Sequence, residues 1–68
     1  MPAKKEFPFT TFNGLVLNVE QEDEHDWVVT LTGDRTKIVA RSDELFCLEV
    51  ARREKAAYEQ RAIDEAPK

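Results

Sequence analysis

Residues 27–41 constrain the fold of this chain more than any other stretch, because apolar and polar side chains alternate on both sides of a short break. The apolar side of this alternation comprises Trp27, Val29 and Leu31 before the break, and Ile38 and Ala40 after it. Such alternation, with many β-branched residues, is typical of strands that bury one face. Gly33 and Asp34 form the break, and glycine accepts the positive φ that tight hairpin turns require. The sequence therefore predicts a β-hairpin centred on this break.

A further strand is predicted over residues 10–20. Leu17 and Val19 share one parity, and Asn18 lies on the opposite one. Gly14 falls inside this run, and glycine within a strand often marks a bulge.

The Phe-Pro-Phe segment at residues 7–9 comes before this strand. Pro8 has no N–H donor, so the segment forms at most an edge strand or an extended lead-in. Phe7 and Phe9 either fold back onto the core or stay exposed as a docking point for a partner.

A helix is predicted to follow the hairpin, with Ser42 or Asp43 as its cap and Ala66, before Pro67, as its end. Its apolar residues fall on one arc at about 100° per residue. They are Phe46, Cys47, Val50, Ala51, Ala57, Tyr58 and Ala62. About 22 helical residues span roughly 33 Å, whereas a six-residue strand spans about 20 Å. The second half of the helix therefore either projects into water or meets another helix through Ala56, Ala57 and Ala62.

These elements predict an α+β fold: a three-stranded antiparallel β-meander followed by one long C-terminal α-helix packed on one face (βββα). Residues 1–6 form a loose tail, residues 7–66 a single small domain, and residues 67–68 a short C-terminal tail. The expected core comprises Leu15, Leu17, Val19, Trp27, Val29, Leu31, Ile38, Ala40, Phe46, Val50, Ala51 and Tyr58.

The order of these motifs resembles the opening half of an OB-fold over roughly residues 12–50. The matching pieces are Gly14-x-Val16, Val19, Trp27-x-Val29-Thr30-Leu31, and Ile38-Val39-Ala40 before a helix. In that family three meandering strands precede a helix and two more strands close a barrel. The residues after residue 50 are predicted to be helical, so the closing strands have no counterpart. The resemblance implies the meander, and no nucleic-acid contact is transferred from it.

Size and charge limit the functional classes. A chain of 68 residues buries only about 60% of its unfolded surface, so a partner or a second copy would supply extra burial. The net charge of −4 disfavours nucleic acid and anionic membranes as partners. No apolar run approaches the ~20 residues of a membrane span. The N-terminal lysines precede no apolar segment typical of a signal peptide, and the single cysteine excludes an internal disulfide. We expect a cytoplasmic protein.

Five of the seven residues at positions 20–26 are acidic, and His25 lies among them. Glu22, Asp23, Glu24 and Asp26 do not have the spacing of a calcium loop, and adjacent residues do not converge as zinc ligands do. We expect no metal and no cofactor. The segment is either a solvated turn or a surface that meets a basic partner.

Catalytic groups are sparse. Cys47 falls on the buried arc of the helix, and His25 is the only histidine, in a turn far away in the sequence. A reactive cysteine needs a base or a positive neighbourhood. Ser42 is better used as a helix cap, and two glycines cannot form a phosphate loop. The chain is not expected to be an enzyme.

The third strand carries a basic row. Arg35, Lys37 and Arg41 share parity with Val39 and are expected on the solvent face of the sheet. Basic groups beside an aromatic side chain are how sheets hold single-stranded nucleic acid. The alternative is an ordinary solvated edge strand, on which charges discourage aggregation.

The first hypothesis is a small acidic, non-enzymatic protein-interaction module that regulates or inhibits a larger protein machine, by analogy with phage- or plasmid-encoded inhibitors. Its candidate contacts are Phe7, Phe9, Glu22, Asp23, Glu24, Asp26, Arg52, Lys55 and Glu59. The second hypothesis is a single-stranded nucleic-acid binder that uses Arg35, Lys37 and Arg41. The third is a homodimer formed through the distal helix.

Overall fold

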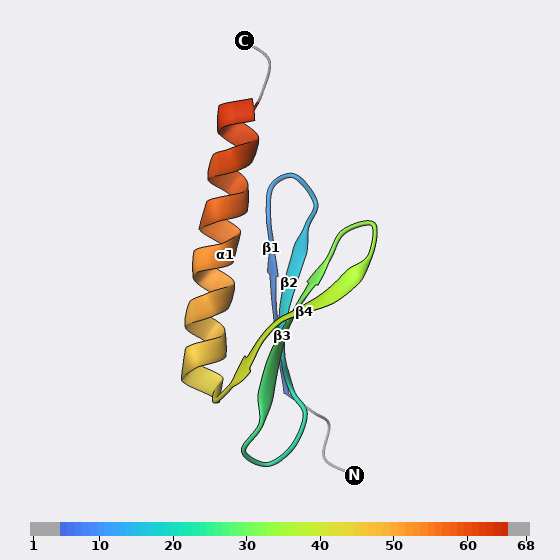
Figure 1. Cartoon of the computed structure of the whole chain (residues 1–68), viewed down its shortest axis with the longest axis vertical. Helices are drawn as coiled ribbons and strands as arrows, with labels where there is room; N and C mark the ends of the chain where they lie inside the picture. The colour runs from blue at the N-terminus through green and yellow to red at the C-terminus, as the bar shows by residue number, and fades with distance from the viewer. Residues whose placement is uncertain (1–4, 66–68) are drawn as a thin grey trace.

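The computed structural model describes residues 5–65 and places one helix against a single face of a four-stranded antiparallel sheet (Figure 1). The elements are β1 (Glu6–Thr10), β2 (Val16–Gln21), β3 (Trp27–Thr32), β4 (Thr36–Ser42) and α1 (Glu44–Glu65). Each strand pairs with the next, in the spatial order β1-β2-β3-β4. The predicted α+β meander with a long C-terminal helix is confirmed. The sheet has four strands rather than three, because the Phe-Pro-Phe segment pairs with β2 as an edge strand.

Residues 1–4 and 66–68 lie outside the described range, so the expected end of the helix at Ala66 and most of both tails fall there. Lys5 and Glu6, which were expected in the N-terminal tail, join the sheet. The Gln21 N–H donates to the Lys5 carbonyl at 3.1 Å, and Glu6 begins β1. The sheet also stays open, with β1 and β4 at its edges, unlike the closed barrel of an OB-fold.

The predicted strand over residues 10–20 is interrupted by a tight loop. The Gly14 N–H donates to the Thr11 carbonyl at 3.1 Å, and the Thr11 N–H donates to the Leu15 carbonyl at 2.8 Å. The buried Thr11 hydroxyl accepts the Leu15 N–H at 2.9 Å. Gly14 has φ of 92°, and no other residue in the described range has a positive φ. The expectation of a bulge within a continuous strand is therefore wrong, because Gly14 closes a hairpin turn.

Gly33 lies close to the Leu15 side chain and does not have a positive φ. A Cβ at this position would lie 2.9 Å from Leu15 Cδ2, which is closer than carbon atoms normally approach. The tip of the β3–β4 hairpin thus lies against the loop between β1 and β2. The expected role of Gly33 in a positive-φ turn is wrong.

A β-bulge in β4 reverses the predicted parity of this strand. Val29 pairs with Ala40 and Thr30 with Ile38, so Val39 is an extra residue between the two pairs. Ile38 consequently lies opposite Thr30 and is 53% exposed, so its predicted place in the core is wrong. Val39 packs against the core instead.

The helix packs on the sheet through small residues. Asp43 caps it, since its Oδ1 accepts the Phe46 N–H at 2.8 Å. Cys47 and Ala51 are fully buried against the sheet, whereas Phe46 is 49% exposed. The predicted place of Phe46 in the core is wrong, because the buried arc is centred on Cys47 and Ala51, about 100° away from Phe46.

The core lies between α1 and the covered face of the sheet. Its buried members are Leu17, Val19, Trp27, Val29, Leu31, Cys47 and Ala51. Other predicted members are partly buried: Leu15, Ala40, Val50 and Tyr58. Burial of the Trp27 indole, on which the predicted sheet depends, is confirmed.

We expect Gly14→Ala to lower the free energy of unfolding by about 1 kcal/mol, because a Cβ disfavours the left-handed region. A Cβ here would meet no atom within 4 Å, so the loss isolates backbone strain. Chemical denaturation measures it. Gly14→Asn is the matched control and should lose less, since asparagine tolerates this conformation. Equal stability of the alanine variant and the parent would contradict the assigned turn.

Candidate protein-interaction surface

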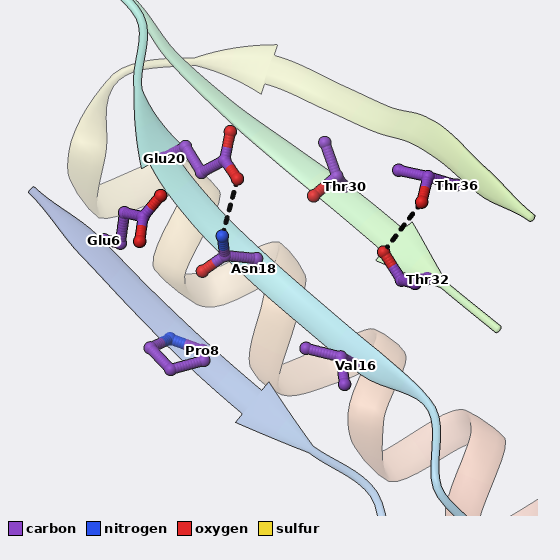
Figure 2. Close-up of a pocket in the computed structure, with 8 residues that line it drawn as sticks. All are labelled: Glu6, Pro8, Val16, Asn18, Glu20, Thr30, Thr32 and Thr36. Atoms are coloured by element: carbon purple, nitrogen blue, oxygen red, sulfur yellow. Dashed lines mark hydrogen bonds between the residues drawn. The ribbon is translucent and has the colours of Figure 1, made fainter. Parts of the chain in front are cut away.

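Within residues 5–65, no element covers the sheet face that points away from α1 (Figure 1). This face is hollowed across β1, β2, β3 and the start of β4, with a volume of about 480 Å³ (Figure 2). We call it the sheet-face hollow. Its lining comprises Glu6, Pro8, Val16, Asn18, Glu20, Thr30, Thr32 and Thr36. These residues share one face because side chains alternate along each strand and the register places them opposite one another.

The sheet-face hollow is rich in hydrogen-bond acceptors. Glu6 and Glu20 are direct cross-strand partners, and no salt bridge joins either to a cation within the described range. The Asn18 amide donates through Nδ2 to Glu20 Oε1 at 2.6 Å. Its Oδ1 is buried and accepts no hydrogen bond from a described residue. Like charges directly opposite on two strands are destabilising, and so is a buried acceptor without a donor.

The acidic segment between β2 and β3 is an exposed turn. Its backbone is held by the Glu22 and Asp23 N–H groups, which donate to the Asp26 carbonyl at 2.9 and 3.1 Å. Glu22 pairs with Arg41 at 3.4 Å, and Asp23, Glu24 and Asp26 are exposed. In the part of the chain that is described, no three acidic, histidine or cysteine side chains converge as a metal ion would require.

The basic residues of the predicted row do not share one face. Lys37 lies opposite Leu31, a core residue, whereas Arg41 lies opposite Val28 on the uncovered face. Arg35 belongs to the turn before β4. The row is broken because the bulge at Val39 reverses the parity between Lys37 and Arg41.

Internal contacts hold two of the three helical candidate residues. Lys55 Nζ lies 3.0 Å from Glu59 Oε1, and Glu59 Oε2 accepts the Phe12 N–H at 3.0 Å. The Lys55 ammonium and the Phe12 amide hold the pKa of the Glu59 carboxyl below its ordinary 4.5. Glu59 therefore ties the β1–β2 loop to α1, and Arg52 remains exposed.

The two phenylalanines of the N-terminal segment lie on the covered face of the sheet. Phe9 packs against the core, and Phe7 stacks on Trp27 with ring centroids 6.0 Å apart. Phe7 is 37% exposed, so it extends the core to the edge of the sheet.

The helix exposes Ala56 and Ala57, and Ala62 is half-buried. Leu45 and Ile63 are exposed on α1, and Phe12 is 64% exposed on the adjacent loop. No helix in residues 5–65 has the length and apolar character needed to cross a membrane.

The sequence pattern did not predict the sheet-face hollow, although it contained one signal for this face. Asn18 and Glu20 lie on the parity opposite to Leu17 and Val19, which marks them as residues of the other face. Glu6 could be added only with the register, since it faces Glu20 across a strand pair that the sequence pattern did not predict.

Comparison of the chain with protein-family models, with curated proteins and with solved structures gives no match.

We expect Glu59→Gln to flatten the acid limb of the stability curve. Because the folded pKa of Glu59 lies below the unfolded value, its contribution is present above the unfolded pKa. The contribution is lost as the pH falls through the folded pKa. Denaturation midpoints of both proteins between neutral and strongly acidic pH measure this. Parallel curves for parent and variant would contradict the contacts assigned to the Glu59 carboxylate. The control is Asp64→Gln, which changes an exposed carboxylate on the same helix.

We expect Cys47 to react slowly with a thiol reagent in the native protein. Burial raises the pKa of the Cys47 thiol above its usual 9.0, and the Ser42 backbone hydrogen bond offsets this only in part. The thiolate is the reactive form. Reaction rates in buffer and in denaturant at one pH measure the difference, and similar rates would contradict the fully buried position.

Proposed function

We propose that this chain is a small non-enzymatic protein-binding module that regulates or inhibits a larger protein in the cytoplasm. One observation carries the proposal: the uncovered sheet face holds a hollow in which Glu6 and Glu20 oppose each other without a described cation. A partner that brings positive charge to this face would relieve the repulsion. The proposed contact surface is the sheet-face hollow together with the adjacent acidic turn at Glu22–Asp26.

The distribution of charge supports a basic partner surface. The exposed carboxylates of the acidic turn follow directly after β2, so they continue the acidic edge that Glu6 and Glu20 begin. Arg41 is the cation placed on this face by the register, and it is already paired with Glu22. Complementary charge steers association and selects partners more than it adds affinity.

The non-enzymatic part of the proposal is supported by the placement of the reactive groups. Cys47 lies in the core, and His25 lies in the exposed turn between β2 and β3. Burial raises the pKa of the Cys47 thiol, which disfavours the thiolate that a nucleophile requires.

Capture from a lysate of the source organism tests the proposal. The immobilised full chain should retain a specific protein that is identified and then rebound in purified form. Glu20→Lys should weaken that binding at least about tenfold, because a cation replaces one of the opposed carboxylates. Asp34→Lys makes the same charge change in the β3–β4 turn and should leave binding intact. Equal retention by both variants would contradict the proposed surface.

An oligonucleotide titration checks the nucleic-acid hypothesis that Arg35, Lys37 and Arg41 motivated. We expect no salt-sensitive binding, because the bulge separates Lys37 from Arg41 and Arg41 pairs with Glu22. Tight binding that Arg41→Ala abolishes would favour a nucleic-acid binder instead.

A further inference from the structure

We propose that the sheet-face hollow binds the guanidinium group of an arginine side chain on a protein partner. This inference rests on the proposed function, because it names the chemistry by which the protein-binding face recognises its partner. The hollow offers acceptors to an incoming group from two neighbouring strands: Glu6 from β1 and Glu20 from β2 (Figure 2).

The charged members of this set match a ligand that only donates hydrogen bonds. Ionised Glu6 and Glu20 are acceptors without donors, and they face each other across the strand pair. A cation between them would convert a repulsive pair into two attractive contacts.

The Asn18 amide orients the Glu20 carboxylate. Its Nδ2 donates to Glu20 Oε1 at 2.6 Å, and its Oδ1 is buried out of reach of an incoming group. Oδ1 accepts no hydrogen bond from a described residue, and Glu6 and Pro8 on the adjacent strand have no side-chain donor. A guanidinium supplies five N–H donors in a rigid plane, so it can contact both carboxylates together.

The remaining lining suits the stem of the same side chain. Pro8 and Val16 are apolar, and Thr30 and Thr32 present methyl groups beside their hydroxyls. Arginine carries an apolar stem behind its charged head, so one side chain uses both parts of the hollow. The volume of about 480 Å³ exceeds what a lone ammonium would fill. It falls within the roughly 300–1,000 Å³ of sites that hold larger ligands.

A blocked Gly-Arg-Gly peptide is the probe. Heteronuclear NMR of the full chain should show saturable shifts of the Asn18 side-chain amide and of backbone amides in β1 and β2. The citrulline peptide, which is neutral and nearly isosteric, should produce none, and the lysine peptide should bind more weakly. Glu20→Gln keeps an acceptor for Asn18 and should weaken arginine binding about tenfold. Asp34→Asn removes the same charge from the exposed β3–β4 turn and should leave the affinity unchanged.

Asn18→Val provides an independent arm. Valine favours strands and removes both the unpaired oxygen and the donor that orients Glu20, so we expect a higher denaturation midpoint together with weaker arginine-dependent shifts. Unchanged arginine affinity in both Asn18→Val and Glu20→Gln would overturn the site. Equal shifts with the citrulline peptide, or shifts confined to the acidic turn, would overturn it as well.

Failure of this inference is distinguishable from failure of the proposed function. A partner that depends on Glu20 in the capture experiment, with no arginine-dependent shift, overturns the guanidinium site alone. Absence of any specific partner in the capture experiment counts against the proposed function, whatever the peptide does.

Discussion

The structure depends on one geometric constraint: a single helix can cover only one face of the sheet. Cys47 and Ala51 are fully buried at the contact, and their small side chains let α1 approach the strands closely. The large apolar groups of the core come from the sheet, chiefly Leu17, Val29 and Trp27. Because nothing in residues 5–65 covers the opposite face, many of its side chains are polar, although Val28 is buried there. The polar surface that we assign to partner binding is therefore a direct consequence of how the core is built.

Sequence periodicity predicted the elements whose side chains are buried on one side. Leu17 and Val19 in β2, and Trp27, Val29 and Leu31 in β3, lie on the face that their alternation indicated. This worked because burial of one face fixes the register of a strand. The sequence also showed that a long helix would follow, since the capping residue Asp43 precedes a run without glycine or proline.

The wrong predictions share a physical cause. One extra residue, or one residue with an unusual backbone conformation, changes the direction in which the neighbouring side chains point. The bulge at Val39 moves Ile38 to the uncovered face and separates Lys37 from Arg41, and no local pattern announced it. The sequence pattern predicts Gly14 within a strand, whereas its positive φ closes the first hairpin. The candidate site depends on the same unseen pairing, because Glu6 meets Glu20 only when β1 is a strand. Contacts such as that between Glu59 and the Phe12 N–H were also beyond sequence reasoning, since 47 residues separate them.

At Asn18, the side chain on the uncovered face is not the one that would stabilise the strand best. A half-buried strand position that faces water is well served by threonine, as at Thr30 directly opposite, because a hydroxyl can rotate toward any partner. An amide is planar, and here one end is held by Glu20 while the other is buried without a donor. Such an acceptor costs about 1–3 kcal/mol, a large share of what a small domain can spare. Local inconsistencies of this kind occur mainly at functional positions in proteins whose other levels of structure agree. The uncovered face thus carries two opposed carboxylates, Glu6 and Glu20, and a buried acceptor without a donor at Asn18. These two features distinguish it from a face that is merely solvated.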